Sequence, residues 1–247
     1  MDRLVHIALS GLRGAMARQT ATANNLANAN TAGFRAEIAE VRPLWVQGSG
    51  LAARASSSEE VLAADMRAGT TMDTGSGLDI ALLGQTMLAV QGPEGDEAYT
   101  RRGDLQRADS GLLTTGDGYP LIGRQGPITL PPVDSLKISE DGQIWVVPAG
   151  GDPNTPQQID QLKLTSPVGS RIVKGLDGLF RVEGGGRLPV DGAAKLKSGT
   201  IEGSNVDPTK ALVDMIEASR SWDNQLKLIS AAREIDTSAT DLMRLPD

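Results

Sequence analysis

The stretch Ala23-Asn24-Asn25-Leu26-Ala27-Asn28-Ala29-Asn30-Thr31-Ala32-Gly33-Phe34-Arg35 decides how this chain is organised. It starts inside an amphipathic helical pattern and continues into residues that favour caps and turns, which predicts that a helix stops between Asn28 and Gly33. Gly33 can take a positive φ without steric cost. Asparagine is a poor metal ligand, so the amides favour hydrogen bonds to backbone groups at the helix end or across an interface over a glycan or metal patch.

Upstream of this stretch, apolar or small residues recur in alternating steps of four and three, the spacing of a heptad seam. The positions are Val5, Leu9, Leu12, Met16, Gln19, Ala23 and Leu26. An ordinary amphipathic helix on a globular core is the alternative interpretation. Gly11 and Gly14 each cost the helix about 1 kcal/mol relative to Ala, but they let another backbone approach closely. The helix is therefore expected to need a partner.

The chain closes with a second helical pattern, in which Asp207 is the predicted N-cap and Pro208 the first helical residue. Val213 and Ile216 widen its apolar face, which predicts contacts with several neighbours. After Ile229 two successive three-residue steps form a stammer, which locally overwinds a coiled coil. The seam runs through Leu212, Met215, Ser219, Trp222, Leu226 and Ile229, then Ala232, Ile235, Ala239 and Leu242.

The middle of the chain has the pattern of β structure. Residues 34–46 fit a strand or irregular arm, and the Ala/Ser/Gly-rich residues 48–68 fit a linker or loosely packed arm. From 72 to 203, short alternating runs are separated by turn signals, which is typical of an antiparallel sandwich or barrel. The turn signals are Asp73-Thr74-Gly75, Asp109-Ser110-Gly111, Asp117-Gly118, Asp141-Gly142 and Asp177-Gly178.

The expected fold is therefore α+β. A mainly antiparallel β domain, sandwich- or barrel-like, is flanked by long N- and C-terminal helices that form a coiled-coil-type bundle on assembly. The predicted segments are an N-terminal helix and cap motif (1–33), a linker or arm (34–71), the β-rich domain (72–203) and the C-terminal helix (204–247).

Composition narrows the function classes. Aromatic residues make up 3% of the 247 residues, which argues against a base- or sugar-stacking surface. A formal net charge of -7 without a basic block argues against nucleic-acid or anionic-membrane partners. Without cysteine, thiolate metal sites and disulfides are excluded. No apolar run has the length of a membrane span, and the N-terminal pattern is not that of a secretory signal.

The sequence contains no recognisable catalytic constellation. His6, the single histidine, has no acidic or serine partner at a useful spacing. Asp141 and Asp152 lack the companion ligands of a calcium loop and fit turns instead. Arg101, Arg102 and Arg107 fit a solvated face better than a subunit contact. No cofactor, metal or catalytic residue is predicted.

The opening stretch closely resembles the N-terminal signature of flagellar rod, hook and hook-filament axial proteins, in which Asn-Asn-Leu-Ala-Asn is followed by Thr and Gly-Phe. The segments Gly77–Ala81, Leu88–Val90, Tyr99–Gly103 and Gly111–Leu113 resemble the β domain shared by the hook and rod group. Gly199–Val206 resembles the lead-in to the C-terminal helix of that group, so the resemblance covers the whole chain.

Within this family the chain is most similar to the proximal-rod branch, of F type. The opening Met1-Asp2-Arg3-Leu4 and the phrase from Met215 to Ile229 carry this similarity. Trp222 stands where Phe or Tyr is commoner. A distal-rod or hook subunit of the same family is the alternative. A secreted β-domain binding module or enzyme, or a scaffold or adaptor, is the alternative of another class.

The resemblance implies a non-enzymatic subunit that leaves the cell unfolded through the flagellar type III export apparatus, without a cleaved signal. Terminal helices that are largely disordered in the monomer would stack around the export channel on assembly. The subunit would form part of the periplasm-spanning rod of the basal body, contact copies of itself and other rod proteins, and carry torque towards the hook. No nucleic acid and no direct membrane insertion are expected.

The two predicted heptad seams and the N-terminal signature together give the candidate assembly residues. They are Leu9, Leu12, Met16, Asn24, Asn25, Leu26, Asn28, Thr31, Gly33, Phe34, Leu212, Met215, Ile216, Trp222, Leu226 and Ile229.

Overall fold

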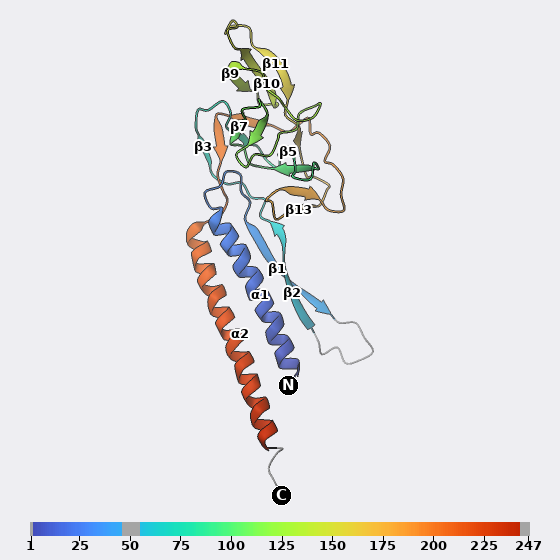
Figure 1. Ribbon diagram of the computed structural model, residues 1–247, viewed down its shortest axis with the longest axis vertical. Helices are drawn as coiled ribbons and strands as arrows, with labels where there is room; N and C mark the ends of the chain where they lie inside the picture. The colour runs from blue at the N-terminus through green and yellow to red at the C-terminus, as the bar shows by residue number, and fades with distance from the viewer. Residues whose placement is uncertain (1, 46–54, 243–247) are drawn as a thin grey trace. The chain divides into compact units, whose positions relative to one another are not determined.

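The computed structural model describes residues 2–45 and 55–242 and shows an α+β chain with mainly antiparallel strands and a helix at each end of this range (Figure 1). The chain divides into two compact units. The helical unit comprises Met1–Ala27, Glu37–Ala63 and Asp207–Asp247, and the β unit comprises Asn28–Ala36 and Ala64–Val206.

The helical unit is built on α1 (Asp2–Ala27) and α2 (Pro208–Leu242), which lie side by side and antiparallel (Figure 1). Both predicted helix limits in this unit are confirmed. α1 ends at Ala27, directly before the turn residues. The Asp207 carboxylate accepts hydrogen bonds from the N–H groups of Thr209 and Lys210 at 2.9 and 3.2 Å, which caps α2.

The arm that follows the signature contains paired strands. β1 (Glu37–Trp45) pairs with β2 (Ala55–Ala64), and α1 packs against β1. Residues 55–64, whose composition fits a linker or loose arm, thus form a strand. Low sequence complexity did not prevent pairing, because a neighbouring strand supplies the backbone hydrogen bonds. The remaining residues assigned to the linker between the two strands, 46–54, lie outside the described residues.

Short strands make up the β unit. They are β3 (Thr71–Asp73), β4 (Ile80–Leu82), β5 (Met87–Gln91), β6 (Glu97–Thr100), β7 (Leu105–Arg107), β8 (Leu113–Thr115), β9 (Val133–Ile138), β10 (Gln143–Pro148), β11 (Gln157–Gln161), β12 (Leu164–Thr165), β13 (Ile172–Lys174), β14 (Phe180–Val182), β15 (Leu196–Ser198) and β16 (Thr200–Glu202). The main sheet has the order β12-β5-β6-β14-β13, and a second has the order β11-β10-β9.

The predicted Asp-Gly hairpins are confirmed where strands adjacent in sequence pair. Gly111, Gly142 and Gly178 take φ values of 83°, 79° and 77° between β7 and β8, β9 and β10, and β13 and β14. Asp73-Thr74-Gly75 differs. This turn follows β3, which pairs with β16 from the far end of the chain instead of with the next strand.

The core of the β unit is apolar and fully buried. Its central side chains come from many of the short strands and lose contact with solvent almost completely: Ile80, Leu88, Leu113, Leu121 and Ile144 are all 0% exposed. A smaller cluster gathers Met87, Tyr99, Phe180 and Leu188. Pairing of β15 with β4 joins the two ends of the unit's sequence.

Candidate assembly interface

The contact between α1 and α2 is made by small residues on both helices. On α2 the buried positions are Ala211, Ala218 and Ala232, and Met215, Trp222, Gln225 and Ile229 are half-buried between them. These seven positions alternate in steps of four and three from 211 to 232, so they form an unbroken heptad seam. Alanine at the seam allows the helix axes to lie close together.

The observed seam corrects part of the predicted one. Met215, Trp222 and Ile229 lie on it as predicted, but Leu212, Ser219 and Leu226 are exposed and their places are taken by Ala211, Ala218 and Gln225. The prediction followed the larger apolar side chains, whereas the helices meet through the smaller ones. With the correct positions the heptad spacing continues through Ala232, and the predicted stammer after Ile229 is absent from this described part of the seam.

α1 presents a matching small face. Gly14, Ala15 and Ala21 are buried, whereas Leu9 and Met16 of the predicted seam are 37% and 51% exposed. A Cβ added at Gly11 would lie 3.0 Å from the side-chain amide of Gln225. At Gly11 a close neighbour is therefore present, the Gln225 side chain of α2 in the same chain, and close approach of another backbone stays a prediction. Leu12 and Leu26 are half-buried, Gln19 and Ala23 are exposed, and the side chain of Val5 lies outside the described residues.

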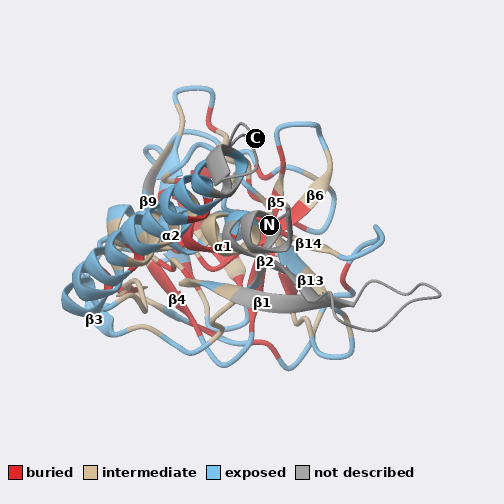
Figure 2. Ribbon diagram, turned by 90° about the horizontal axis from the view of Figure 1, so that it is seen from below, coloured by how far each residue is buried: buried red, intermediate tan, exposed pale blue. Residues whose placement is uncertain are grey.

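Large apolar side chains are left on the solvent side of this helix pair. The exposed apolar set consists of Leu9, Met16, Leu212, Val213, Ile216, Leu226, Leu228 and Ile235, whose exposed fractions run from 37% to 58%. At about 100° of rotation per residue, Leu212, Ile216 and Leu226 lie on one side of the α2 seam, and Leu228 and Ile235 lie on the other. In Figure 2 most of α2 is pale blue, the colour of exposed residues.

Within the signature, two asparagines tie the end of α1 to the start of β1. Asn25 accepts a hydrogen bond from the Glu37 N–H at 2.7 Å and donates to the Glu37 carbonyl at 2.9 Å. Asn24 donates to the Glu37 carboxylate at 2.6 Å. The prediction that these amides bind backbone groups at the helix end is confirmed for Asn25.

The rest of the signature belongs to the β unit. Asn28 accepts a hydrogen bond from the Thr31 hydroxyl at 3.1 Å, and the Gly33 N–H donates to the Glu202 carbonyl at 2.7 Å. Gly33 has a φ of 65°, as predicted, and any Cβ there would collide with the Arg101 carbonyl. The Lys174 ammonium lies 3.7 Å from the centre of the Phe34 ring, a cation–π contact.

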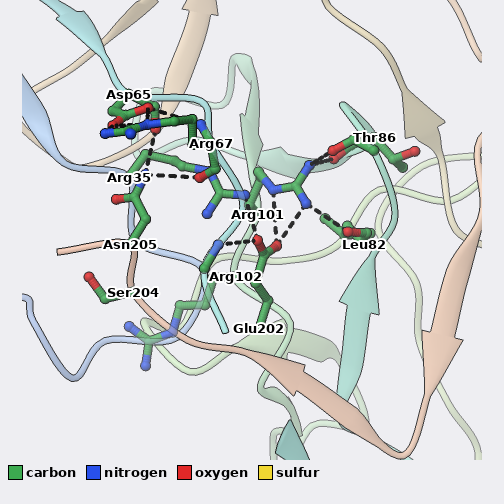
Figure 3. A network of polar contacts seen from close by, with 12 residues as sticks. Arg35, Asp65, Arg67, Leu82, Thr86, Arg101, Arg102, Glu202, Ser204 and Asn205 are labelled. Carbon is green, nitrogen blue, oxygen red and sulfur yellow. Dashed lines mark hydrogen bonds and ion pairs between the residues drawn. The ribbon is translucent and has the colours of Figure 1, made fainter. Parts of the chain in front are cut away.

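A buried charge cluster anchors the end of the signature (Figure 3). Glu202, at the end of β16, accepts hydrogen bonds at 2.7 Å from both Arg35 and Arg101, and the three side chains are 0–2% exposed. Arg101 also donates to the carbonyls of Gly84 and Thr86 at 2.8 Å and of Leu82 at 2.6 Å. Three backbone carbonyls of residues 82–86 thus hold Arg101 in place. Arg35 belongs to the segment that follows α1 in the sequence.

The electrostatics of this cluster favour an ionised Glu202. Burial acts to raise the pKa of the Glu202 carboxyl, but the hydrogen bonds from Arg35 and Arg101 outweigh it and hold the pKa below its ordinary value. For Arg101, burial and the neighbouring Arg35 charge lower the pKa of the guanidinium. With two cations and one carboxylate, removal of Glu202 would leave two buried positive charges without a counter-ion.

Sequence reasoning missed this cluster. Arg101 was placed on a solvated face, which is wrong, since it is 2% exposed. Its neighbour Arg102 is half-buried and binds Asp104 and Asp117, and Arg107 is exposed as predicted. Glu202 is the acidic residue of an otherwise small and uncharged run, Gly199–Val206, and this contrast was the available signal.

The described residues contain no group of three or more potential metal ligands of the His, Asp and Glu types. Asp152 accepts a hydrogen bond from the Asn154 N–H, as a turn residue does, and Asp141 forms an ion pair with Lys195. The side chain of His6 lies outside the described residues. Across the described part of the chain, no helix combines the length and apolar character needed to span a membrane.

Three family models match the chain in the regions just described. Residues 6–35 match "Flagella basal body rod protein", residues 81–146 match "Flagellar hook protein FlgE/F/G D1 domain", and residues 197–242 match "Flagellar basal body rod FlgEFG protein C-terminal". All three models describe flagellar rod or hook proteins, which gives the class of protein that the chain resembles.

Full-length relatives narrow the class. The flagellar basal-body rod protein FlgF of Salmonella typhimurium is 37% identical, and that of Escherichia coli 36%, each over 99% of this chain and 100% of the relative. FlgG of Bacillus subtilis is 28% identical over 99% of this chain and 100% of the relative. The chain belongs to the family of flagellar basal-body rod proteins, in its FlgF branch. It is a structural subunit of the rod.

Proposed function

We propose that this subunit forms part of the proximal rod and assembles with copies of itself and with other rod proteins into the drive shaft that carries torque to the hook. One observation carries this proposal: the exposed apolar set on α1 and α2. A stable soluble helix pair would bury residues such as Leu212, Ile216 and Leu226, so their exposure favours burial against neighbouring subunits. The identity to FlgF proteins favours the proximal over the distal position.

The placement of these residues supports contacts with more than one neighbour. Leu212, Ile216 and Leu226 lie on one side of the α2 seam, and Leu228 and Ile235 on the other. Heterologous contacts of this kind, in which different patches meet on adjacent copies, generate helical arrays. The coiled-coil-type bundle on assembly is therefore part of the proposal.

The candidate interface residues then serve different purposes. Leu9, Met16, Leu212, Ile216 and Leu226 are the ones available to neighbours. Leu12, Leu26, Met215, Trp222 and Ile229 are half-buried and support the helix pair. The signature residues Asn24, Asn25, Asn28, Thr31, Gly33 and Phe34 shape the end of α1 and the turn that follows it.

The proposal keeps the four predicted segments, 1–33, 34–71, 72–203 and 204–247, and a sandwich- or barrel-like β domain, which the common core of many short strands supports. It also includes passage through the flagellar type III export apparatus without a cleaved signal, no membrane insertion and no enzymatic activity. Membership of the rod-protein family supports these features.

The test is a charge placed in the exposed apolar set. Leu226→Asp should leave the melting temperature of the β unit nearly unchanged and abolish incorporation into the rod, measured by immunoblotting of purified basal bodies and by swimming. Asn224→Asp, a charge at an exposed polar position of the same helix, is the matched control and should assemble normally. Incorporation of the Leu226→Asp subunit would refute the proposed interface.

Electron microscopy of basal bodies from a strain lacking this chain tests the position. A rod arrested early, with no distal segment and no hook, supports the proximal assignment. A rod arrested late identifies a distal subunit, and intact hooks would remove the rod function itself.

A further inference from the structure

The chain passes between its two units at four places, after residues 27, 36, 63 and 206. Three segments of the β unit lie next to the last three of these crossings: 33–36, 65–69 and 202–205. They meet at two residues near the end of β16, Glu202 and Asn205 (Figure 3). Both lie in the β unit, as do all their partners described below, so the arrangement belongs to that unit by itself.

Asn205 uses its whole side chain to hold two of these segments. Its carbonyl oxygen accepts a hydrogen bond from the Ala36 N–H at 2.8 Å, and its amide nitrogen donates to the carbonyls of Asp65 and Arg67 at 2.8 and 2.9 Å. Its own N–H donates to the Phe34 carbonyl at 3.3 Å. An asparagine amide offers both an acceptor and two donors, so this set of contacts requires that residue type.

Glu202 holds the same two segments through its carboxylate. One oxygen accepts from Arg35 at 2.7 Å and from the Gly69 N–H at 3.0 Å. The other oxygen is bound to Arg101, which three carbonyls fix within the β unit. The segments also bind each other directly, since the Asp65 N–H donates to the Ala36 carbonyl at 2.8 Å.

We propose that Glu202 and Asn205 form a clasp that docks the segments 33–36 and 65–69 onto the β unit in the free subunit, before α1 and α2 pack against neighbouring subunits. The helical unit then starts from points already fixed in the β unit when a neighbour arrives. Less conformational entropy is lost at the moment of assembly, because the connecting residues are ordered beforehand. This use of the clasp rests on the proposed rod function, but its existence in the free subunit does not.

The sequence signature 23–35 therefore has two parts that make contacts in different units. Asn24 and Asn25 serve the end of α1, whereas Gly33 and Arg35 serve the β unit. A monomer whose terminal helices are disordered should therefore still hold residues 33–36 in place.

Hydrogen–deuterium exchange of the full-length free subunit, read by mass spectrometry, tests the clasp. Amides in 33–36 and 65–69 should be protected to the level of β4 and β5, and Asn205→Ala should raise exchange in both segments at least tenfold with little change in β4 and β5. Glu94→Gln is the control, because Glu94 is exposed and lies in neither segment, and it should leave both segments protected.

A second variant covers the case in which Asn205→Ala unfolds the β unit. Arg35→Gln removes the guanidinium that binds Glu202 from segment 33–36 and keeps the Arg101–Glu202 ion pair. It should therefore raise amide exchange in 33–36 alone. The clasp is overturned if 33–36 exchanges as fast as unstructured peptide in the native subunit, or if Arg35→Gln leaves its protection intact. Since exchange is measured without assembly, failure of the clasp and failure of the rod assignment are separate results.

Discussion

The two units of this chain bury different kinds of side chain. The β unit places large apolar residues such as Leu88 and Leu113 at 0% exposure, while the helical unit buries Ala15, Ala211 and Ala218 and leaves Leu212 and Ile216 about half exposed. Burial of a leucine stabilises a fold by about 1.5–3 kcal/mol, whereas alanine contributes far less. The β unit thus has the core of an independently stable domain, and the helical unit lacks one of its own.

This difference suggests that the β unit and the helical unit contribute separately to stability and to assembly. The buried apolar core of the described chain lies in the β unit, and under the proposed function the exposed apolar side chains of the helices supply the free energy of assembly. Helices whose fully buried contacts are small residues are weak in isolation, because the packing of alanine does little to offset the entropy lost on ordering. Each variant below acts on one of the two units and measures how far this separation holds.

The largest expected effect is that of Glu202→Gln. It leaves Arg35 and Arg101 buried without a counter-ion, which should cost about 3–5 kcal/mol of unfolding free energy. Urea unfolding followed by Trp145 fluorescence, with Trp45 and Trp222 changed to Phe, reads the β unit alone. Glu94→Gln, at an exposed position, is the control. Equal stability of the two variants would show that the buried charges do not stabilise the β unit.

A truncation pair compares the units directly. Leu113→Ala should cost about 2–5 kcal/mol, because it opens a cavity in the buried core. The same truncation at Leu226, which is 44% exposed, should change the unfolding free energy by about 0.5 kcal/mol or less. Urea titration of both variants gives the two values. Similar losses at the two positions would mean that α2 is part of the cooperative core of the free subunit.

Gly33→Ala should have the next largest effect. A non-glycine residue at a φ of 65° costs about 1–3 kcal/mol, and the added Cβ meets the Arg101 carbonyl. Gly11→Ala is the contrasting variant in the helical unit, since its Cβ meets only a flexible glutamine side chain. Thermal unfolding should show a lower midpoint for the first variant and a nearly unchanged one for the second.

The smallest expected effect is that of mild acid. The unfolding free energy of the β unit should fall slightly at first and then further as the pH decreases. Because the pKa of Glu202 is lower in the folded than in the unfolded chain, its stabilisation is full above the ordinary carboxyl pKa of about 4.3. It is lost as the pH falls through the lower folded value. Urea midpoints measured from pH 6 to pH 3 should fall, and Glu202→Gln should reduce this fall. An unchanged slope in the variant would exclude Glu202 as its source.

Local features were predicted well from the sequence because they depend on few residues. The end of α1, the Asp207 cap, the positive φ of Gly33 and the Asp-Gly hairpins each follow from the conformational preferences of one or two residues. The turn after Asp73 was an exception, because the partner of β3 lies at the other end of the β unit. Strand pairing over such distances leaves no local pattern.

The packing of α1 against α2 within the chain was predicted in part, and the assembly interface stays a prediction. The heptad spacing of α2 was correct, but the register of half its positions was not, because hydrophobicity alone favours Leu212 and Leu226 over Ala211 and Gln225 at a seam. The choice depends on how closely the two helices approach, and the missing side chain at Gly11 leaves room for Gln225 of α2. The burial of Arg101 could not be predicted from its neighbours in the sequence, because its counter-ion Glu202 is 101 residues away.

Pairing between the ends of the β unit also controls when the subunit can fold. The Thr200 hydroxyl binds the Asp73 carboxylate across 127 residues of sequence, and β15 joins β4 over a comparable separation. Contacts between such distant residues slow folding, because long loops must close before they form. For the proposed export route, a chain that emerges gradually cannot complete its β unit until both pairing partners have emerged. Under that proposal the topology delays folding of the β unit until export of the subunit is nearly complete.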